Sequence, residues 1–373
     1  MAIDGGLMDG WLALHGCTTQ SDPTRAVIPY GCLTYYTPAQ VPNITRLATT
    51  YALSDQTFSE NDSPSWGGHV YAAAATLDGF SGENPTAEAG VTPGPGWGCD
   101  SKKTSLWTSA TGASSRQPSC IPDPSSSLAN GGAFRPTPVQ YVPTIFDRLD
   151  AAGQPWKIYG QPTGNNIWAI CPSFAECLYG PQHSKLVNSA QVLTDASNGT
   201  LPSYSIVTPS GSATSANGGM GTSQHNLASM VGGDNWIGKV TDAAMSGPEA
   251  NSTAVFITYD DCGCFYDHVA PGVNPDGTPR GMRMPMVIVS PYARKGYTDS
   301  NVATFASILA FTEHTLGITT PLTANDAQAY DYSDSFDFTQ VPLAPTRMVS
   351  TAIPPSTRAA LLANPDVGDG DAT

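Results

Sequence analysis

The side chains best suited to chemistry lie in residues 260–268, which hold two adjacent aspartates, a glycine turn, a third carboxylate and an imidazole. The apolar run 254–257 precedes them and predicts a fully buried strand. In α/β proteins, ligands bind just beyond the carboxyl ends of such strands. Adjacent ionised aspartates repel each other unless a compensating charge, commonly a metal ion, is nearby. We therefore predict that Asp260 and Asp261 ligate a metal, whereas a bare Asp-Asp pair would more often be a solvated acidic loop.

The elements that must position these carboxylates alternate between helix and strand. Helices are predicted over residues 38–53, 138–152, 226–245 and 302–316, and strands over residues 156–160, 203–208, 254–257 and 286–290. This alternation predicts an α/β fold with a doubly wound, mainly parallel sheet flanked by helices. We expect one domain over residues 1–342. Residues 343–373 are rich in Pro, Ala and Ser, and we expect them to form a mobile C-terminal tail.

Composition narrows the classes of partner. The 373 residues fit one large α/β domain with long loops, since only 13% are charged and 37 glycines and 32 prolines are present. The net charge of −15 argues against nucleic acid as a partner, because that binding depends on phosphate neutralisation. It also argues against lasting attachment to anionic lipid. No run of 18 apolar residues occurs, so we expect no transmembrane segment.

The eight cysteines predict an oxidising compartment, and therefore a secreted or periplasmic protein. Their order suggests local pairs, although eight cysteines allow 105 connectivities. The suggested pairs are Cys17–Cys32, Cys99–Cys120, Cys171–Cys177 and Cys262–Cys264. Zinc ligation is the alternative, but the spacings fit no structural zinc site. Residues 1–6 lack the features of a signal peptide, so we expect the beginning of the chain to be missing.

Several short segments follow one another along the chain: residues 51–58, 63–69, 97–100, 146–153, 222–225, 233–236, 258–269 and 284–297. In this order they resemble the phosphoesterase family that includes bacterial phospholipases C and secreted acid phosphatases. The likeness covers residues 7–342, and the segment 258–269 is its most specific part. It implies the alkaline-phosphatase-like fold and the hydrolysis of phosphomonoesters or phospholipids.

The resemblance implies that Ser65 is the nucleophile. Its position in a Pro/Trp/Gly turn could present the hydroxyl to a cleft, although most serines in such turns are structural. A serine needs a base or a metal to become a good nucleophile, so Asp260 and Asp261 would hold one divalent ion beside it. Oxygen ligands suit Mg²⁺, Ca²⁺ or Mn²⁺, and zinc or iron would also be compatible. His69 matches a position near the phosphate; a histidine at a helix start is the ordinary alternative.

Two further histidines are candidates. His225 lies on a loop between a strand and a helix, and we expect it to protonate the leaving alcohol and to help water attack a phosphoserine. Taken alone, such a histidine is more often a surface or capping residue. His268 with Asp267 would orient the two metal-ligating carboxylates, and a buried structural hydrogen bond is the alternative.

The chain departs from the family pattern at its start. Family members begin with an apolar strand that ends in Glu-Asn and supplies metal ligands, and nothing before Met8 matches it. We therefore expect an N-terminally incomplete sheet with unpaired neighbouring strand edges. Glu60 and Asn61 are alternative ligands, and Ser300 stands where the family usually has a histidine.

These observations favour a metal-dependent phosphoric ester hydrolase. A non-catalytic relative that binds a ligand is the main alternative, because the first pair of metal ligands is missing. An acyl-transferring serine hydrolase using Ser65 and His225 would ignore chelators, but no G-x-S-x-G motif supports it. A redox role for residues 262–264 ranks lowest, since the spacing is not C-x-x-C.

Overall fold

The computed structural model describes residues 3–13, 17, 30–61, 63–124, 138–160, 168–209, 221–225, 228–263 and 265–363, which form a mixed α/β fold. The α-helices in these ranges are α2 (Pro42–Thr50), α3 (Ser65–Ala74), α5 (Ile145–Ala151), α6 (Ala175–Tyr179), α7 (Gln191–Asn198), α8 (Met230–Ser246), α9 (Phe305–Leu316), α10 (Ala324–Gln328) and α11 (Pro355–Ala363). Short 3-10 helices are η1 (Asp4–Gly6), η2 (Gly10–Ala13), η3 (Gly31–Leu33), η4 (Cys171–Ser173), η5 (Pro181–Lys185), η7 (Ala250–Ser252) and η8 (Ser333–Ser335). None of the described helices has the length and apolar composition needed to cross a bilayer.

The first sheet has four strands in the order β12-β1-β11-β9. They are β12 (Tyr297–Asp299), β1 (Ala52–Ser54), β11 (Met286–Val289) and β9 (Val255–Ile257). Strand β11 runs antiparallel to both of its neighbours, so that Ile288 lies opposite Ala52 on one side and Phe256 on the other. All four residues of β11 are apolar and buried, as expected for an interior strand with a neighbour on each side.

The second sheet has three parallel strands in the order β7-β6-β8. They are β7 (Leu186–Asn188), β6 (Trp156–Gly160) and β8 (Tyr204–Val207). Helix α5 precedes β6, and α7 connects β7 to β8 by crossing over the central strand. This is the α/β connectivity expected from the alternating pattern. The first sheet departs from the mainly parallel sheet that the sequence predicts, because its only parallel pair is β1 with β12 and β11 is antiparallel to both of its neighbours.

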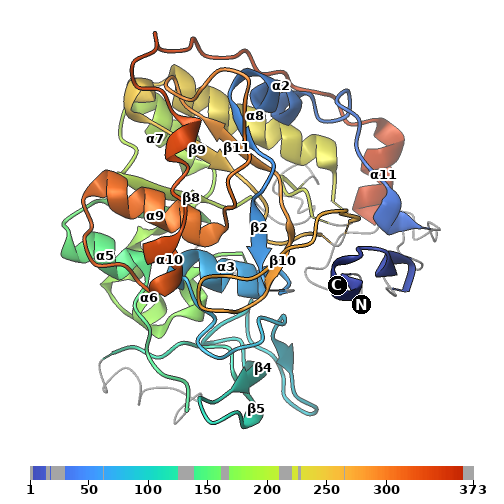
Figure 1. Ribbon diagram of the computed structural model, residues 1–373, viewed down its shortest axis with the longest axis vertical. Helices are drawn as coiled ribbons and strands as arrows, with labels where there is room; N and C mark the ends of the chain where they lie inside the picture. The colour runs from blue at the N-terminus through green and yellow to red at the C-terminus, as the bar shows by residue number, and fades with distance from the viewer. Residues whose placement is uncertain are drawn as a thin grey trace.

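Helices flank the strands in Figure 1, where β8, β9 and β11 are drawn between α2, α7 and α8 above and α3, α5 and α9 below. Buried Asp234 of α8 links this helix to the start of α2. Its carboxylate accepts the backbone N–H groups of Asn43 (3.0 Å) and Ile44 (2.9 Å), the first turn of α2. These donors are the ones a helix start leaves without internal partners, so α8 provides the cap that α2 lacks locally.

The hydrophobic core has two main clusters. One gathers α3, α5 and β6, with Val70, Phe146 and Ile158 fully buried. The other gathers α2 and β11, with Leu47 and Ile288 fully buried. The side chain of Ile308 on α9 packs against both.

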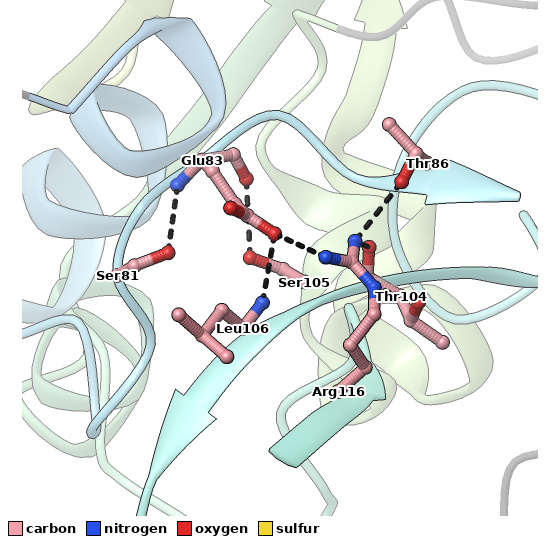
Figure 2. A network of polar contacts seen from close by, with 7 residues as sticks. All are labelled: Ser81, Glu83, Thr86, Thr104, Ser105, Leu106 and Arg116. Carbon is pink, nitrogen blue, oxygen red and sulfur yellow. Dashed lines mark hydrogen bonds and ion pairs between the residues drawn. The ribbon is translucent and has the colours of Figure 1, made fainter. Parts of the chain in front are cut away.

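A small antiparallel sheet supports the start of α3. Its strands are β3 (Thr86–Ala87), β4 (Lys103–Thr108) and β5 (Ser114–Pro118), near the bottom of Figure 1. Figure 2 shows Arg116 of β5 paired with Glu83 at 2.8 Å, while the Glu83 carboxylate also accepts the N–H of Leu106. The segment fixed in this way presents Asn84, whose side-chain oxygen accepts the backbone N–H of Trp66 at 3.0 Å.

A second short pair, β2 (Phe58–Glu60) with β10 (Arg280–Arg283), runs antiparallel.

The segment that follows residue 342 lies along α2 and α8. Asn43 exchanges two hydrogen bonds with the backbone of Val349, and Asn235 exchanges two with Thr351.

Strand β6 has the bounds that the sequence predicts, and three of the expected disulfides, Cys17–Cys32, Cys99–Cys120 and Cys171–Cys177, are confirmed. The fourth pair involves Cys264, which lies outside the described residues.

Three predicted helices are shorter than expected. The helix predicted over 138–152 is α5, which begins only at Ile145 because Thr144 and Asp147 form its capping box. Residues 52–54 form β1 and not the end of a helix, because they pair with both β11 and β12. Helix α9 starts at Phe305, since Thr304 and Ser307 form its capping box and the preceding Ala303 is hydrogen-bonded to Phe58.

The prediction of a fully buried strand over 254–257 is wrong. All three residues of β9 are partly exposed, because β9 is an end strand of its sheet.

Candidate active site

Two segments far apart in the chain meet at the carboxyl end of β9. Ser65 is the first residue of α3, and its hydroxyl donates a hydrogen bond of 2.9 Å to Oδ2 of Asp261, 196 residues away. The other oxygen of Asp261, Oδ1, accepts the backbone N–H of Gly263 at 2.7 Å. The carboxylate is therefore oriented by its own turn while it binds the serine.

Glycine allows this close approach. A Cβ on Gly68, one helical turn after Ser65, would lie 2.0 Å from the backbone oxygen of Asp260. Contacts this short between a Cβ and a backbone oxygen do not occur, so any larger residue would push α3 away from β9. Gly68 thus sets the distance between the helix that carries the serine and the segment that carries the two aspartates.

His69 contacts Asp260, the other aspartate of the adjacent pair. Its Nε2 is 3.2 Å from Oδ2 of Asp260, whose side chain is 32% exposed. Burial alone would raise the pKa of Asp260, but the hydrogen bond and charge of His69 outweigh it and lower that pKa to about 2. Asp260 is therefore ionised at neutral pH.

The rings of two predicted site histidines flank one tryptophan. The ring of Trp168 lies 5.8 Å from that of His69 and 5.4 Å from that of His225. The loop that carries His225 is joined to the end of β9, since the hydroxyl of Tyr259 donates to the side-chain oxygen of Gln224. The structure thus brings His69 and His225 to the same site as the aspartates.

These groups face a cavity of about 2350 Å³. Its wall includes His69, His225, Asp260 and Asp261. Ser65 is 1% exposed and is not among the described residues of the wall, although its hydrogen-bond acceptor Asp261 is. Access to the serine hydroxyl therefore depends on the position of Asp261.

Asp267 and His268 lie differently from the expectation. Both oxygens of Asp267 accept from Arg283, at 2.7 and 2.9 Å. His268 is 72% exposed, with Nδ1 3.9 Å from Asp267. Asp267 therefore pairs with Arg283 at the end of β10. It does not, together with His268, orient Asp260 and Asp261 as expected from the sequence. His268 lines the cavity at the surface.

Glu60, the alternative metal ligand, belongs to another environment. The residue is 1% exposed, and its carboxylate accepts from the side-chain N–H of Asn274 at 2.7 Å. It is not among the described residues that line the cavity, so its position does not support ligation beside Asp260. Burial raises the pKa of Glu60 from its ordinary value of 4.5 to about 7.

This buried carboxyl predicts a loss of stability with rising pH. The unfolded chain releases the Glu60 proton near pH 4.5, whereas the folded chain holds it to about pH 7. The stabilising contribution is therefore complete below pH 4.5 and is lost as the pH rises through 7, by about 3 kcal/mol at most. We expect Glu60→Gln to remove this part of the pH dependence. Thermal unfolding of both proteins between pH 4 and 8 measures it, and parallel curves for the two would contradict the expectation.

The donor set partly fits a divalent cation. The carboxylates of Asp260 and Asp261 are adjacent, ionisable and exposed to the cavity, and oxygen ligands of this kind suit Mg²⁺, Ca²⁺ or Mn²⁺. Within the described ranges, no cluster of three or more His, Cys, Asp or Glu side chains converges as a metal site. A cation held here would complete its shell with water or substrate oxygens.

Sequence reasoning missed three residues of the site, namely Gly68, Asn84 and Trp168. The Gly-Gly pair next to Ser65 was a visible signal for Gly68. No pattern in a single sequence indicates that Asn84 would receive the N–H of Trp66, or that Trp168 would lie between two histidines.

Comparison with known proteins gives one match that covers most of the chain. A family model described as Phosphoesterase family matches residues 1–319. The chain is also similar to parts of several curated proteins. Non-specific phospholipase C6 of Arabidopsis thaliana is 34% identical over 117 residues, which are 27% of this chain and 22% of that protein.

Two bacterial relatives show a similar partial match. Non-hemolytic phospholipase C of Pseudomonas aeruginosa is 26% identical over 220 residues, 48% of this chain and 30% of that protein. Phospholipase C B of Mycobacterium tuberculosis is 30% identical over 115 residues, 24% of this chain and 22% of that protein. The matched parts span less than a third of each of these relatives.

Proposed function

Since this chain belongs to the phosphoesterase family, we propose that it is a phosphoric ester hydrolase in which Ser65 attacks phosphorus. The observation that carries this proposal is the 2.9 Å hydrogen bond between the Ser65 hydroxyl and Asp261, at the end of a strand and beside a cavity. The family match and the names of the relatives do not favour the alternative of a non-catalytic binding protein.

The residues have complementary tasks in this mechanism. Asp261 Oδ2 accepts the hydrogen bond of the Ser65 hydroxyl and so aims a lone pair of Oγ at phosphorus, in line with the leaving oxygen; the hydroxyl proton passes to water as the new P–O bond forms. Gly263 keeps the carboxylate in place through its N–H. His69 holds Asp260 ionised and near the reaction centre.

Asp260 and Asp261 would hold one divalent ion, Mg²⁺, Ca²⁺, Mn²⁺ or Zn²⁺. When bound, it would neutralise negative charge on the phosphoryl oxygens. The ionised state of Asp260 supports this assignment, since a metal ligand must be deprotonated. The described residues supply only two carboxylate ligands, so the remaining ligands would be water or substrate oxygens. Metal analysis of the purified protein is the direct test.

His225 is proposed to protonate the leaving alcohol. We expect His225→Gln to lower kcat for an alkyl phosphate such as glycerol phosphate by roughly 10²-fold or more, because an alkoxide leaves poorly without a proton. The effect on p-nitrophenyl phosphate should be much smaller, since p-nitrophenolate needs little protonation. His314→Gln, at an exposed histidine paired with Asp331, is the control. Equal losses with both substrates would contradict the assignment.

The ester class is tested with two chromogenic substrates. The large cavity and the phospholipase C names of the relatives favour a phosphodiester with a bulky alcohol, whereas the net charge of −15 favours a small soluble ester. p-Nitrophenylphosphorylcholine and p-nitrophenyl phosphate separate the two. Faster turnover of the diester supports a phospholipase C type of activity, and faster turnover of the monoester supports a phosphatase.

We also propose that the two larger sheets are parts of one doubly wound sheet of the alkaline-phosphatase type. The parallel order of β7-β6-β8 and the helices on both sides support this arrangement. A secreted or periplasmic location is proposed from the three disulfides. Fractionation of the source cells, followed by non-reducing electrophoresis, tests the location.

A further inference from the structure

We propose that Asn84 is a positioning residue for the attack of Ser65 on phosphorus, and that the small sheet β3-β4-β5 acts on the reaction through it. Asn84 contacts the helix that carries the serine, and it is not among the described residues that line the cavity. This role rests on the proposed function, because it concerns the group that holds the attacking hydroxyl in place.

The start of α3 has no side-chain cap of its own. Residue 64, at the N-cap position, is a proline, and its side chain accepts no hydrogen bond from the first turn. The first backbone N–H groups of a helix have no partner within the helix, so those of Trp66 and Gly67 need acceptors from elsewhere. Ser65 is the first residue of this turn, and its orientation therefore depends on what binds the two groups.

One segment supplies both acceptors. The side-chain oxygen of Asn84 accepts the N–H of Trp66 at 3.0 Å, and the backbone oxygen of Gly82 accepts the N–H of Gly67 at 3.1 Å. A Cβ on Gly67 would lie 2.8 Å from the Cα of Gly82, so the two backbones are in direct contact. Residues 82–84 thus cap α3 from outside the helix.

The small sheet fixes this segment through Glu83, the residue before Asn84. The carboxylate of Glu83 accepts the N–H of Leu106 at 3.0 Å and pairs with Arg116 at 2.8 Å, as Figure 2 shows. The backbone oxygen of Glu83 accepts the hydroxyl of Ser105, a fully buried residue, at 3.1 Å. Both the side chain and the main chain of residue 83 are therefore bound to the sheet, which gives the neighbouring Asn84 a defined position.

Trp66 transmits this restraint to Ser65. The indole N–H of Trp66 donates to the hydroxyl of Ser173 at 3.0 Å, and its ring meets that of Phe80 edge-on with the centroids 5.1 Å apart. Trp66 is thus held at its ring by these contacts and at its backbone by the amide oxygen of residue 84. The adjacent Ser65 can then keep its hydroxyl directed at Asp261, 2.9 Å away.

Removal of the acceptor at position 84 should misplace the nucleophile. The N–H of Trp66 would lose its partner, so the first turn of α3 would shift or fray. A displacement of about 1 Å at a reacting group can cost on the order of 100-fold in rate. A role in stability alone predicts a different result, namely a lower melting temperature with an unchanged kcat well below it.

Asn84→Ala is expected to lower kcat for p-nitrophenyl phosphate by about 10- to 100-fold and to leave KM within about twofold, because Asn84 orients the nucleophile without lining the cavity. Asn84→Asp keeps an acceptor oxygen at the same place and should retain most of the native kcat. Should Asn84→Ala fail to fold, Asn84→Ser takes its place, since a serine hydroxyl ends one bond short of the amide oxygen.

Hydrogen exchange provides a readout that does not involve turnover. The amide of Trp66 should exchange at least ~10-fold faster in Asn84→Ala than in the native chain, because its acceptor is lost. Asn84→Asp should restore the protection.

Asn188→Ala is the matched control. The side-chain oxygen of Asn188 also accepts a backbone N–H, that of Ala190 at 2.9 Å, and Asn188 is not among the described residues that line the cavity. This variant loses the same kind of hydrogen bond, and its kcat should stay within about twofold of the native value.

A kcat of Asn84→Ala close to that of the native chain, together with an inactive Ser65→Ala, would overturn the proposal and leave the hydrolase assignment intact. A well-folded Asn84→Asp as slow as Asn84→Ala, an equal loss in Asn188→Ala, or a rise in KM in place of the fall in kcat would overturn it as well. Normal turnover by Ser65→Ala would instead withdraw the proposed function, and the role of Asn84 with it.

Discussion

Replacement of Ser65 by alanine is expected to lower kcat for p-nitrophenyl phosphate by roughly a thousandfold or more. The hydroxyl that donates to Asp261 is the only group assigned to attack phosphorus, and its removal leaves no nucleophile for the covalent step. Stability should change little, because the substitution removes a single oxygen from a helix start. Steady-state kinetics and thermal unfolding of the same preparation separate the two effects.

Ser63→Ala is the matched control. This neighbouring serine is also buried, but its hydroxyl donates to the backbone oxygen of Glu60 at 2.7 Å and has no assigned role in the reaction. We expect this variant to retain most of its turnover. Normal turnover by Ser65→Ala, or an equal loss in both variants, would withdraw the nucleophile assignment.

Asp261→Asn is expected to lower both turnover and bound metal. The amide is neutral, so it attracts a cation less strongly, and it accepts the hydrogen bond of the Ser65 hydroxyl less strongly. We expect kcat to fall on the order of 100-fold or more and the divalent metal content to fall well below that of the native chain. Elemental analysis after gel filtration, with kinetics on the same sample, measures both quantities.

Asp331→Asn provides the comparison for the metal measurement. This aspartate pairs with His314 at 2.8 Å, and it does not line the cavity. Its metal content and turnover should match those of the native chain. Unchanged metal content in Asp261→Asn, together with reduced turnover, would leave Asp261 only the role of orienting Ser65 and would move the cation site elsewhere.

Short-range features of this protein were predictable from local patterns. The bounds of β6 and the position of the Asp-Asp pair after an apolar run depend on neighbouring residues, and the three confirmed disulfides join cysteines that are consecutive in the sequence, 6 to 21 positions apart. The ends of α2 and α9 could not be predicted from local sequence alone. Residues 52–54, for example, form a strand only because β11 and β12 lie beside them. Pairing between distant segments overrides local helical preference.

The amino-acid sequence by itself determined the chemical inventory of the site: Ser65, two adjacent carboxylates, and histidines at 69 and 225. Only the tertiary structure decided their partners. It brought Ser65 to Asp261, set their separation through Gly68, assigned Asp267 to Arg283 and left β9 half-exposed. The physical reason is range, because residue types follow local rules whereas these contacts arise between segments far apart in the chain that meet only when the helices and sheets pack together.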